Sequence, residues 1–297
     1  ANRHIYSKIY EEVNSESSDF NIEDGDVIVL FGGFSENAIH LCLSLSRNNR
    51  VQFCFVTRNA KKHLNDSKIS RIINRIKENG CIVKWYDCDV SDESQLANLS
   101  DKLYKEFKHV SGIINCAGIE TKGLIANKDE QLIRNVIGPK VLGTYYISRY
   151  FQKFECRFFV AFSSLASIVK SVGQADYAYA NKFMDLYISN MKMGFGKCIS
   201  ICWPGFKNAG MAKRNMVNFD KMIARPLGYR EIETVFNKIL KNYDGNIIVL
   251  DSETDTSLQN IEDKNNGKQQ LTKVLKNSKD VQRELIGIWK NILGIDT

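Results

Sequence analysis

Short apolar runs alternate with longer amphipathic stretches between residue 27 and about residue 251. The short runs are rich in Val, Ile, Phe and Cys, and polar residues rarely alternate with them. Such runs are typical of strands that are covered on both faces of a sheet. The predicted strands are Val27–Phe31, Val51–Thr57, Cys81–Tyr86, Val110–Asn115, Arg157–Ser163, Lys197–Trp203 and Asn246–Leu250.

The segments between these runs have the length and periodicity of helices. In Asp66–Asn79 the isoleucines recur at helical spacing, and Gly80 follows as a stop signal. Ser91–Lys108 likewise places its apolar residues on one face. Alternating strands and helices predict an α/β fold, with a Rossmann-like doubly wound parallel sheet of about seven strands.

Polar stretches bound this segment on both sides. Residues 1–24 are polar and acidic, and we expect a linker or the end of a preceding element there. Residues 25–250 form the predicted domain, and residues 251–278 read as a flexible linker with few apolar residues. Residues 279–297 predict an amphipathic helix, which either folds back on the main domain or begins another one.

Composition narrows the class of protein. Of the 297 residues, 43% are apolar, and the net charge of +7 is spread along the chain without a basic block, so we do not expect nucleic-acid binding. The eight cysteines form no CxxC pair, which predicts buried free thiols in a reducing compartment and no metal site. Because no apolar run approaches the roughly 20 residues of a membrane span, we expect a cytoplasmic protein without a membrane segment.

A glycine turn follows the first predicted strand. Gly32, Gly33, Phe34 and Ser35 lead into an apolar helix, the arrangement in which a dinucleotide pyrophosphate meets a helix N-terminus. However, Ser35 and Ala38 stand where the G-x-G-x-x-G pattern has glycines, and Glu36 adds negative charge. An ordinary strand-to-helix turn explains this motif alone about as well.

Residues after the next three strands strengthen the cofactor interpretation. Arg58 follows the second strand, where an arginine can pair with the 2′-phosphate of NADP, although an exposed surface arginine is the simpler alternative. Asp89 and Val90 follow the third strand, and Asp89 could accept a hydrogen bond from adenine or simply favour a helix N-terminus. After the fourth strand, Asn115, Ala117 and Gly118 supply a turn of small residues beside the expected cleft.

Four further residues form a candidate catalytic group. Tyr177 and Asn181 lie one turn apart at the start of a predicted helix. Ser164 ends the fifth strand thirteen residues before Tyr177, and Lys140 lies thirty-seven residues before it. The neighbouring Ser163 leaves some ambiguity, but the spacing favours Ser164.

Longer strings carry a resemblance to a known family. They are Phe162-Ser163-Ser164, Pro139-Lys140-Val141-Leu142-Gly143, Gly173-Gln174-Ala175-Asp176-Tyr177-Ala178-Tyr179-Ala180-Asn181, and Trp203-Pro204-Gly205-Phe206. Over about residues 25–250 the chain resembles ketoreductase domains of modular polyketide synthases, in the short-chain dehydrogenase/reductase superfamily. The Trp-Pro pair resembles synthases whose acyltransferase acts in trans. The helix Asp280–Leu293 resembles the first helix of an acyl carrier protein.

The resemblance implies NADPH-dependent reduction of a β-ketoacyl thioester carried on the phosphopantetheine of an acyl carrier protein, beside neighbouring synthase domains. Tyr177 would donate the proton, and Lys140 would lower the tyrosine pKa from its usual value near ~10 and hold the nicotinamide ribose. Ser164 would hydrogen-bond the ketone oxygen, and Asn181 would anchor a water that relays protons. Pro204 and Gly205 would complete the cofactor site.

Some features depart from the family pattern. Glu120-Thr121-Lys122 replaces the Leu-Asp-Asp marker of one alcohol stereochemistry, which leans toward an L-hydroxyl product without assigning it, and Val169 replaces the tryptophan marker of the other. The stretch 205–224 predicts either a lid over the acyl chain or a core-packing helix. Two alternatives to an active reductase stay open: a redox-silent or epimerising domain, suggested by Ser35 and Glu36, and a structural module.

Overall fold

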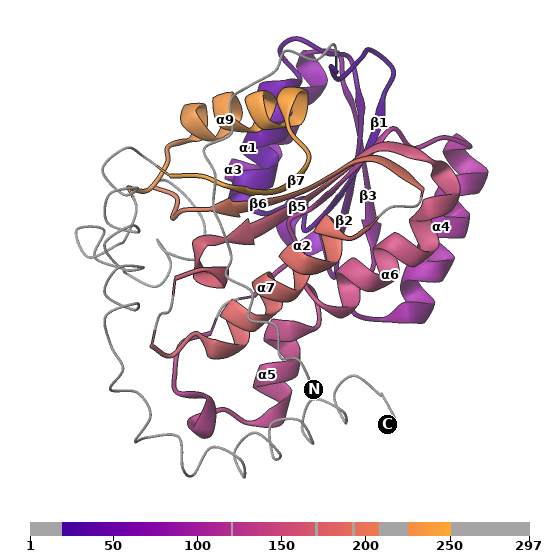
Figure 1. The fold of residues 1–297 in the computed structure, drawn as a ribbon. Coiled ribbons are helices and arrows are strands. Elements are labelled where there is room, and N and C mark those ends of the chain that lie inside the picture. The colour runs from indigo at the N-terminus through magenta and orange to yellow at the C-terminus, as the bar shows by residue number, and fades with distance from the viewer. Residues whose placement is uncertain (1–19, 120, 170–171, 192–193, 208–224, 251–297) are drawn as a thin grey trace, which may run out of the picture.

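Seven parallel strands form one sheet in the order β3-β2-β1-β4-β5-β6-β7 in the computed structural model (Figure 1). The predicted α/β fold and strand number are therefore confirmed. The strands are β1 Val27–Phe31, β2 Gln52–Thr57, β3 Ile82–Asp87, β4 Gly112–Asn115, β5 Cys156–Ser164, β6 Phe195–Trp203 and β7 Gly245–Ile248.

The structure describes residues 20–119, 121–169, 172–191, 194–207 and 225–250. The predicted linker at 251–278 and the helix at 279–297 lie outside the described residues, as do most of residues 1–24 and of the stretch 205–224. The predictions made for those segments therefore stay predictions.

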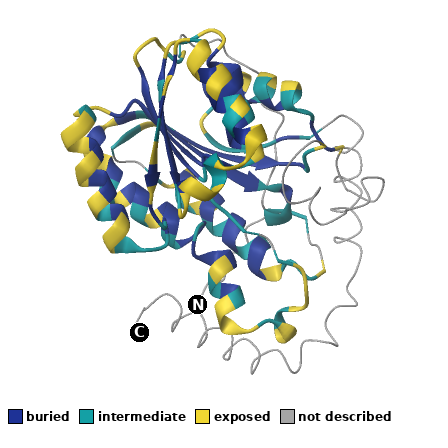
Figure 2. Ribbon diagram, turned by 180° about the vertical axis from the view of Figure 1, so that it is seen from behind, coloured by how far each residue is buried: buried dark blue, intermediate teal, exposed yellow. Residues whose placement is uncertain are grey.

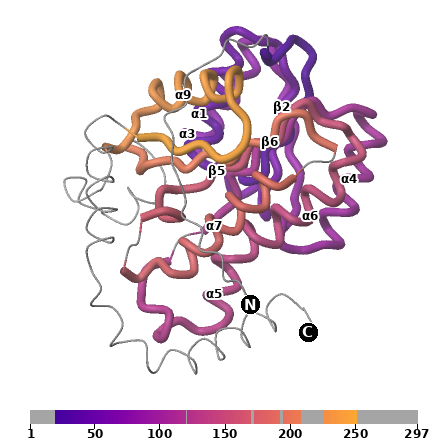
Figure 3. The backbone as a smooth tube through the Cα atoms, viewed as in Figure 1, coloured from indigo at the N-terminus to yellow at the C-terminus, as the bar shows by residue number. Residues whose placement is uncertain are grey.

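Helices cover both faces of the sheet, α1, α3 and α9 on one face and α4, α6 and α7 on the other (Figure 1). Figure 3 shows that α9 lies beside α1, although they stand at opposite ends of the described chain. The helices are α1 Glu36–Leu45, α2 Ala60–Leu64, α3 Ser67–Glu78, α4 Glu93–Phe107, α5 Glu130–Ile137, α6 Leu142–Phe151, α7 Ala175–Ser189 and α9 Tyr229–Asn242, with short 3-10 turns at Ile125–Asn127, Gln152–Phe154 and Leu165–Ser167.

Two apolar clusters, one on each face, explain why the strands read as continuous apolar runs. Ile28 and Leu30 of β1 join the cluster that contains α1, α3 and α9, whereas Val29 and Phe31 join the cluster on the other face. Alternate side chains of a strand point to opposite faces, so a strand buried on both faces must be apolar throughout. Figure 2 shows this pattern, with buried strands at the centre and exposed residues on the outer helix faces.

Helix ends differ from the predicted ends by a residue or two, for a local reason. The predicted helix Asp66–Asn79 is α3, and its two end residues are the caps: Asp66 accepts hydrogen bonds from the N–H groups of Lys68 and Ile69. The predicted helix Ser91–Lys108 begins only at Glu93, because the Asp92 side chain caps it through the Gln95 N–H. Side-chain capping thus decides where each helix begins.

The strand order places a crevice at one edge of the sheet. The chain moves outward from β1 to β2 and β3, and then returns to place β4 on the other side of β1. The connections after β1 and β4 therefore leave in opposite directions. Doubly wound sheets bind ligands at such a switch point, outside the carboxyl ends of the strands.

Candidate active site

The turn after β1 requires glycine at its first position. Gly32 has a φ of +72°, and a Cβ there would lie 2.9 Å from the backbone of Ala117. A Cβ on Gly33 would lie 3.0 Å from the Leu30 carbonyl oxygen. The turns after β1 and β4 are therefore in direct contact, and both border the crevice.

The side chains of Phe34 and Ser35 both make contacts within the protein. The Phe34 ring is 3% exposed, packs edge-on against Phe55 at 5.3 Å and stacks on His63 at 5.1 Å between centroids. The Ser35 hydroxyl caps α1 by accepting a hydrogen bond from the Ala38 N–H at 3.4 Å, and Glu36 is exposed. Glycine at Gly32 and the N-terminal amides of α1 thus fit a pyrophosphate.

A cavity of about 240 Å³ lies beyond the carboxyl ends of β2 and β3. It brings together Arg58 and Asp89, two predicted cofactor residues. Asp89 is oriented by the Ser91 N–H, which donates to its Oδ1 at 2.9 Å. No motif in the sequence marks the contribution of α5 to this cavity. The remaining lining residues are Ser91, Gln131, Arg134, Asn135, Ile137, Gly138, Pro139 and Leu142.

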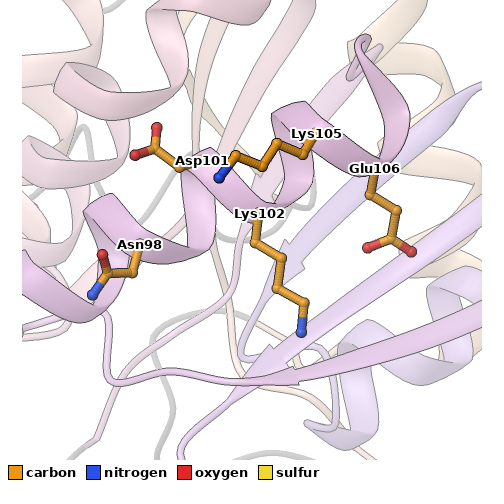
Figure 4. Close-up of a pocket in the computed structure, with 5 residues that line it drawn as sticks. All are labelled: Asn98, Asp101, Lys102, Lys105 and Glu106. Atoms are coloured by element: carbon orange, nitrogen blue, oxygen red, sulfur yellow. The ribbon is translucent and has the colours of Figure 1, made fainter.

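A larger hollow of about 470 Å³ lies on the outer face of α4, away from this crevice (Figure 4). All five of its lining side chains come from this one helix, and two of them are already paired: Asp101 with Lys153 and Glu106 with Lys84, each at 2.6 Å. An open hollow of charged side chains on one helix lacks the enclosed apolar walls of a cofactor site. The smaller cavity is therefore the better candidate for a cofactor site.

Asn115 holds the turn after β4. Its side chain is fully buried, with Nδ2 donating to Thr144 Oγ1 and Oδ1 accepting from the Ala117 N–H, both at 3.1 Å. The predicted cofactor contact of Asn115 would therefore involve the backbone rather than the side chain. Val90 is also buried, and a Cβ on Gly143 would approach its side chain to 2.9 Å.

Lys140, between α5 and α6, reaches from this turn toward α7. A Cβ on Gly118 would lie 2.7 Å from Lys140 Cε, so glycine gives the lysine side chain its path. Lys140 Nζ donates to the Phe162 carbonyl oxygen at 2.7 Å and lies 5.9 Å from the centroid of the Tyr177 ring. Burial lowers the pKa of Lys140 to about 8, although Cys116, Asp185 and Cys202 act in the opposite direction.

Helix α7 presents Tyr177 and Asn181 on the same face. Tyr177 is 6% exposed and lies in the first turn of the helix, which begins at Ala175. Asn181 is fully buried, and its Nδ2 donates to the Tyr177 carbonyl oxygen at 2.7 Å. Its Oδ1 is buried and has no hydrogen-bond donor in the part of the chain that the structure describes. A buried acceptor of this kind suits a bound water.

The two serines at the end of β5 differ in their surroundings. Ser163 is buried, and its Oγ lies 3.8 Å from Cys202 Sγ. Ser164 is partly exposed, and its Oγ accepts from the Ala166 N–H at 3.2 Å. This difference supports Ser164 as the residue that reaches substrate. Pro204 and Gly205 follow β6, and the Gly205 carbonyl oxygen accepts from the Leu227 N–H at 2.9 Å.

The predicted residues thus gather along one edge of the sheet. Most of the predicted cofactor residues lie at the ends of β1 to β4 and β6, and the candidate catalytic group lies around β5 and α7. None of the helices in the described part of the chain combines the length and apolar character that a membrane span requires.

Comparison with known proteins identifies the family. Residues 26–208 match the family model for the KR domain. Polyketide synthase PksN of Bacillus subtilis (strain 168) is 30% identical over 154 residues, which cover 50% of this chain and 3% of that protein. Polyketide synthase PksL of the same organism is 26% identical over 233 residues, covering 76% and 5% respectively. The chain thus spans only a small part of these relatives.

Solved structures share the fold. A ketoreductase domain from the bacillaene assembly line superimposes with a TM-score of 0.73 at 22% identity, over 82% of this chain and 60% of that one. An N-terminal ketoreductase from the macrolactin assembly line gives a TM-score of 0.69 at 24% identity, over 82% and 48%.

Proposed function

Because this chain belongs to the family of KR domains, we propose that it reduces the ketone of a β-ketoacyl thioester to the β-hydroxyacyl thioester, with NADPH as reductant. KR domains of polyketide synthases are oxidoreductases of the short-chain dehydrogenase/reductase type. The observation that carries the proposal is the buried Lys140 beside Tyr177, at the edge of the sheet where Ser164 ends β5.

The proposed chemistry needs a proton at the ketone oxygen as a hydride reaches the carbon. When NADPH is bound, this hydride would come from its nicotinamide ring, which would be left as the oxidised cofactor. As the C=O π bond breaks, Tyr177 gives its hydroxyl proton to the oxygen, and Ser164 donates a hydrogen bond that stabilises the developing charge. The ammonium of Lys140 favours the phenolate that Tyr177 leaves behind. Asn181 Oδ1 holds the water that returns a proton.

Different groups of predicted cofactor residues would bind different parts of the dinucleotide. Gly32 and Gly33, with the backbone of Phe34 and Ser35, would hold the pyrophosphate. Arg58 would pair with the 2′-phosphate, which favours NADPH over NADH. The turn of Asn115, Ala117 and Gly118, together with Lys140, Tyr177, Pro204 and Gly205, would hold the nicotinamide half, and Asp89 and Val90 the adenine.

The proposal also includes the carrier of the substrate and the neighbouring domains of the synthase. We infer that an acyl carrier protein presents the chain on phosphopantetheine, which the resemblance of Asp280–Leu293 to a carrier helix supports. The Trp203-Pro204 pair and the similarity to PksN and PksL support a synthase with an acyltransferase in trans, acting beside neighbouring synthase domains. All eight cysteines carry free thiols, which fits a cytoplasmic location.

An NADPH titration followed by turnover tests the proposal. NADPH fluorescence should change saturably on binding, and a β-keto thioester should then oxidise NADPH and yield an equal amount of alcohol. NADH should bind more weakly. Absence of binding together with exchange of the α-proton would contradict reduction in favour of epimerisation, and absence of both would leave only a structural module.

A further inference from the structure

A buried ion pair lies directly beside the proposed proton donor. Lys128 Nζ contacts both carboxylate oxygens of Asp176, at 2.7 and 2.8 Å, and also donates to the Thr121 carbonyl oxygen at 3.0 Å. The two side chains are only 2% and 1% exposed. The ammonium of Lys128 therefore has all three of its donor directions used inside the protein.

The pair connects two segments that are far apart in sequence. Lys128 ends the connection from β4, which follows the Ala117–Gly118 turn, whereas Asp176 lies in the first turn of α7. A backbone hydrogen bond of 3.1 Å from Gly123 to Gly173 joins the same two segments, and a Cβ on Gly173 would come within 3.2 Å of the Gly123 nitrogen. Two independent contacts thus hold these segments together.

The pair is also linked to the reacting group. The N–H of Tyr177 donates to Asp176 Oδ1 at 2.9 Å, so the carboxylate that binds Lys128 also caps the backbone of the tyrosine. A change in the position of Asp176 must therefore move the first turn of α7 and the tyrosine in it. The wall formed by residues 121–128 would move relative to Tyr177 at the same time.

The two joined segments expose apolar side chains at this point. Leu124, next to Gly123, is 56% exposed, and Val172, next to Gly173, is 90% exposed. Large exposed apolar side chains on two adjoining segments form a surface that suits an apolar ligand. In a reductase, that ligand is the acyl chain attached to the ketone.

We propose that Lys128 and Asp176 form a positioning pair, which sets the orientation of Tyr177 against the acyl-binding wall and so selects the face of the ketone that is reduced. This inference rests on the proposed function. A buried ion pair is weak evidence for stability, since desolvation offsets much of its attraction. The pair does, however, require a fixed geometry, and it therefore holds residues 121–128 and the first turn of α7 in one relative position.

The test compares Lys128→Met and Asp176→Asn with a matched control. Lys153→Met breaks the ion pair with Asp101, which has similar geometry at 2.6 Å but exposed side chains, and it lies at the opposite end of β5. Each variant is assayed with a racemic α-methyl-β-keto thioester, and all four stereoisomers of the alcohol are separated, so that the ratio of the two β-carbon configurations is measured. We expect Lys128→Met and Asp176→Asn to raise KM and to change this β-carbon ratio at least about threefold, with Lys128→Arg restoring much of it.

Loss of folded enzyme alone lowers the rate but leaves both KM and the β-carbon ratio at their wild-type values. That result in Lys128→Met, or an equal change in Lys153→Met, would overturn the positioning role.

Hydrogen–deuterium exchange distinguishes failure of this inference from failure of the proposed function, because it needs no turnover. Lys128→Met should accelerate amide exchange in residues 121–128 and in the first turn of α7 together, whereas Lys153→Met should change neither. Accelerated exchange in only one of the two segments would show that the pair does not couple them, whether or not the wild-type chain oxidises NADPH.

Discussion

The two ends of the proposed cleft are built in different ways. At the β1 turn the backbone geometry is the main requirement: Gly32 is held at a φ of +72° against the backbone of Ala117, while Phe34 stacks on His63 and Ser35 caps α1. Around Tyr177 the site depends on particular side chains, because Lys140 and Asn181 are buried and make specific hydrogen bonds. Side-chain changes are therefore tolerated at the first end as long as backbone geometry survives, whereas at the second end each side chain is part of the chemistry.

Replacing Tyr177 with Phe should produce the largest effect. The ring keeps its packing, but the proton donor is lost, so ketone-dependent NADPH oxidation should fall about 1,000-fold or more. NADPH affinity, measured by fluorescence titration, should stay within about twofold of wild type. A variant that still turns over at a tenth of the wild-type rate would show that another group donates the proton.

The pH dependence of turnover should reflect Lys140. Because burial lowers its pKa to about 8, the ammonium is present below that pH and is lost above it. Since the charged form assists Tyr177, kcat should fall as the pH rises through about 8, by up to about tenfold per unit. The profile is measured at saturating NADPH and substrate.

Lys140→Arg provides the comparison, because a guanidinium keeps its charge throughout this range. The overall rate of this variant should be lower, since the planar guanidinium is wider than the lysine side chain that passes Gly118. The decline in kcat near pH 8 should disappear. An unchanged decline in this variant would assign it to a different group.

At the backbone-controlled end, Gly32→Ala should weaken NADPH binding, whereas Ser35→Gly should leave it equal or strengthen it. An alanine Cβ at Gly32 meets the Ala117 backbone at 2.9 Å and adopts an unfavourable φ, so unfolding free energy should drop by about 1–3 kcal/mol and NADPH binding should weaken about tenfold. Ser35→Gly removes only a cap, which glycine replaces at a cost of a few tenths of a kcal/mol. Its NADPH affinity should stay equal or rise.

Both variants are measured by denaturant unfolding and by NADPH titration. A large loss of affinity in Ser35→Gly would mean that the hydroxyl contacts the cofactor rather than only the helix.

Local sequence patterns were enough to predict most of the strands and helices of the fold. The apolar runs located all seven strands: the central strands are buried on both faces, and the edge strands β3 and β7 stay apolar enough to be recognised although they are only partly buried. The spacing of Ser164, Tyr177 and Asn181 located one corner of the candidate site. The sequence could not predict that Phe34 stacks on His63, or that α5 lines the cavity beside Arg58, because neither contact leaves a periodic signal. The Lys128–Asp176 pair was missed for the same reason, as it joins residues 48 positions apart.

Transfer of a labelled hydride tests the central claim most directly. The purified chain is incubated with NADPH that carries deuterium at the transferable position and with a β-keto thioester, and the product is analysed by mass spectrometry and NMR. We predict one deuterium at the β-carbon of the alcohol in the wild-type product and none above background with Tyr177→Phe. Saturable NADPH binding without deuterium in any product would contradict the assignment of this cleft as a site of ketone reduction.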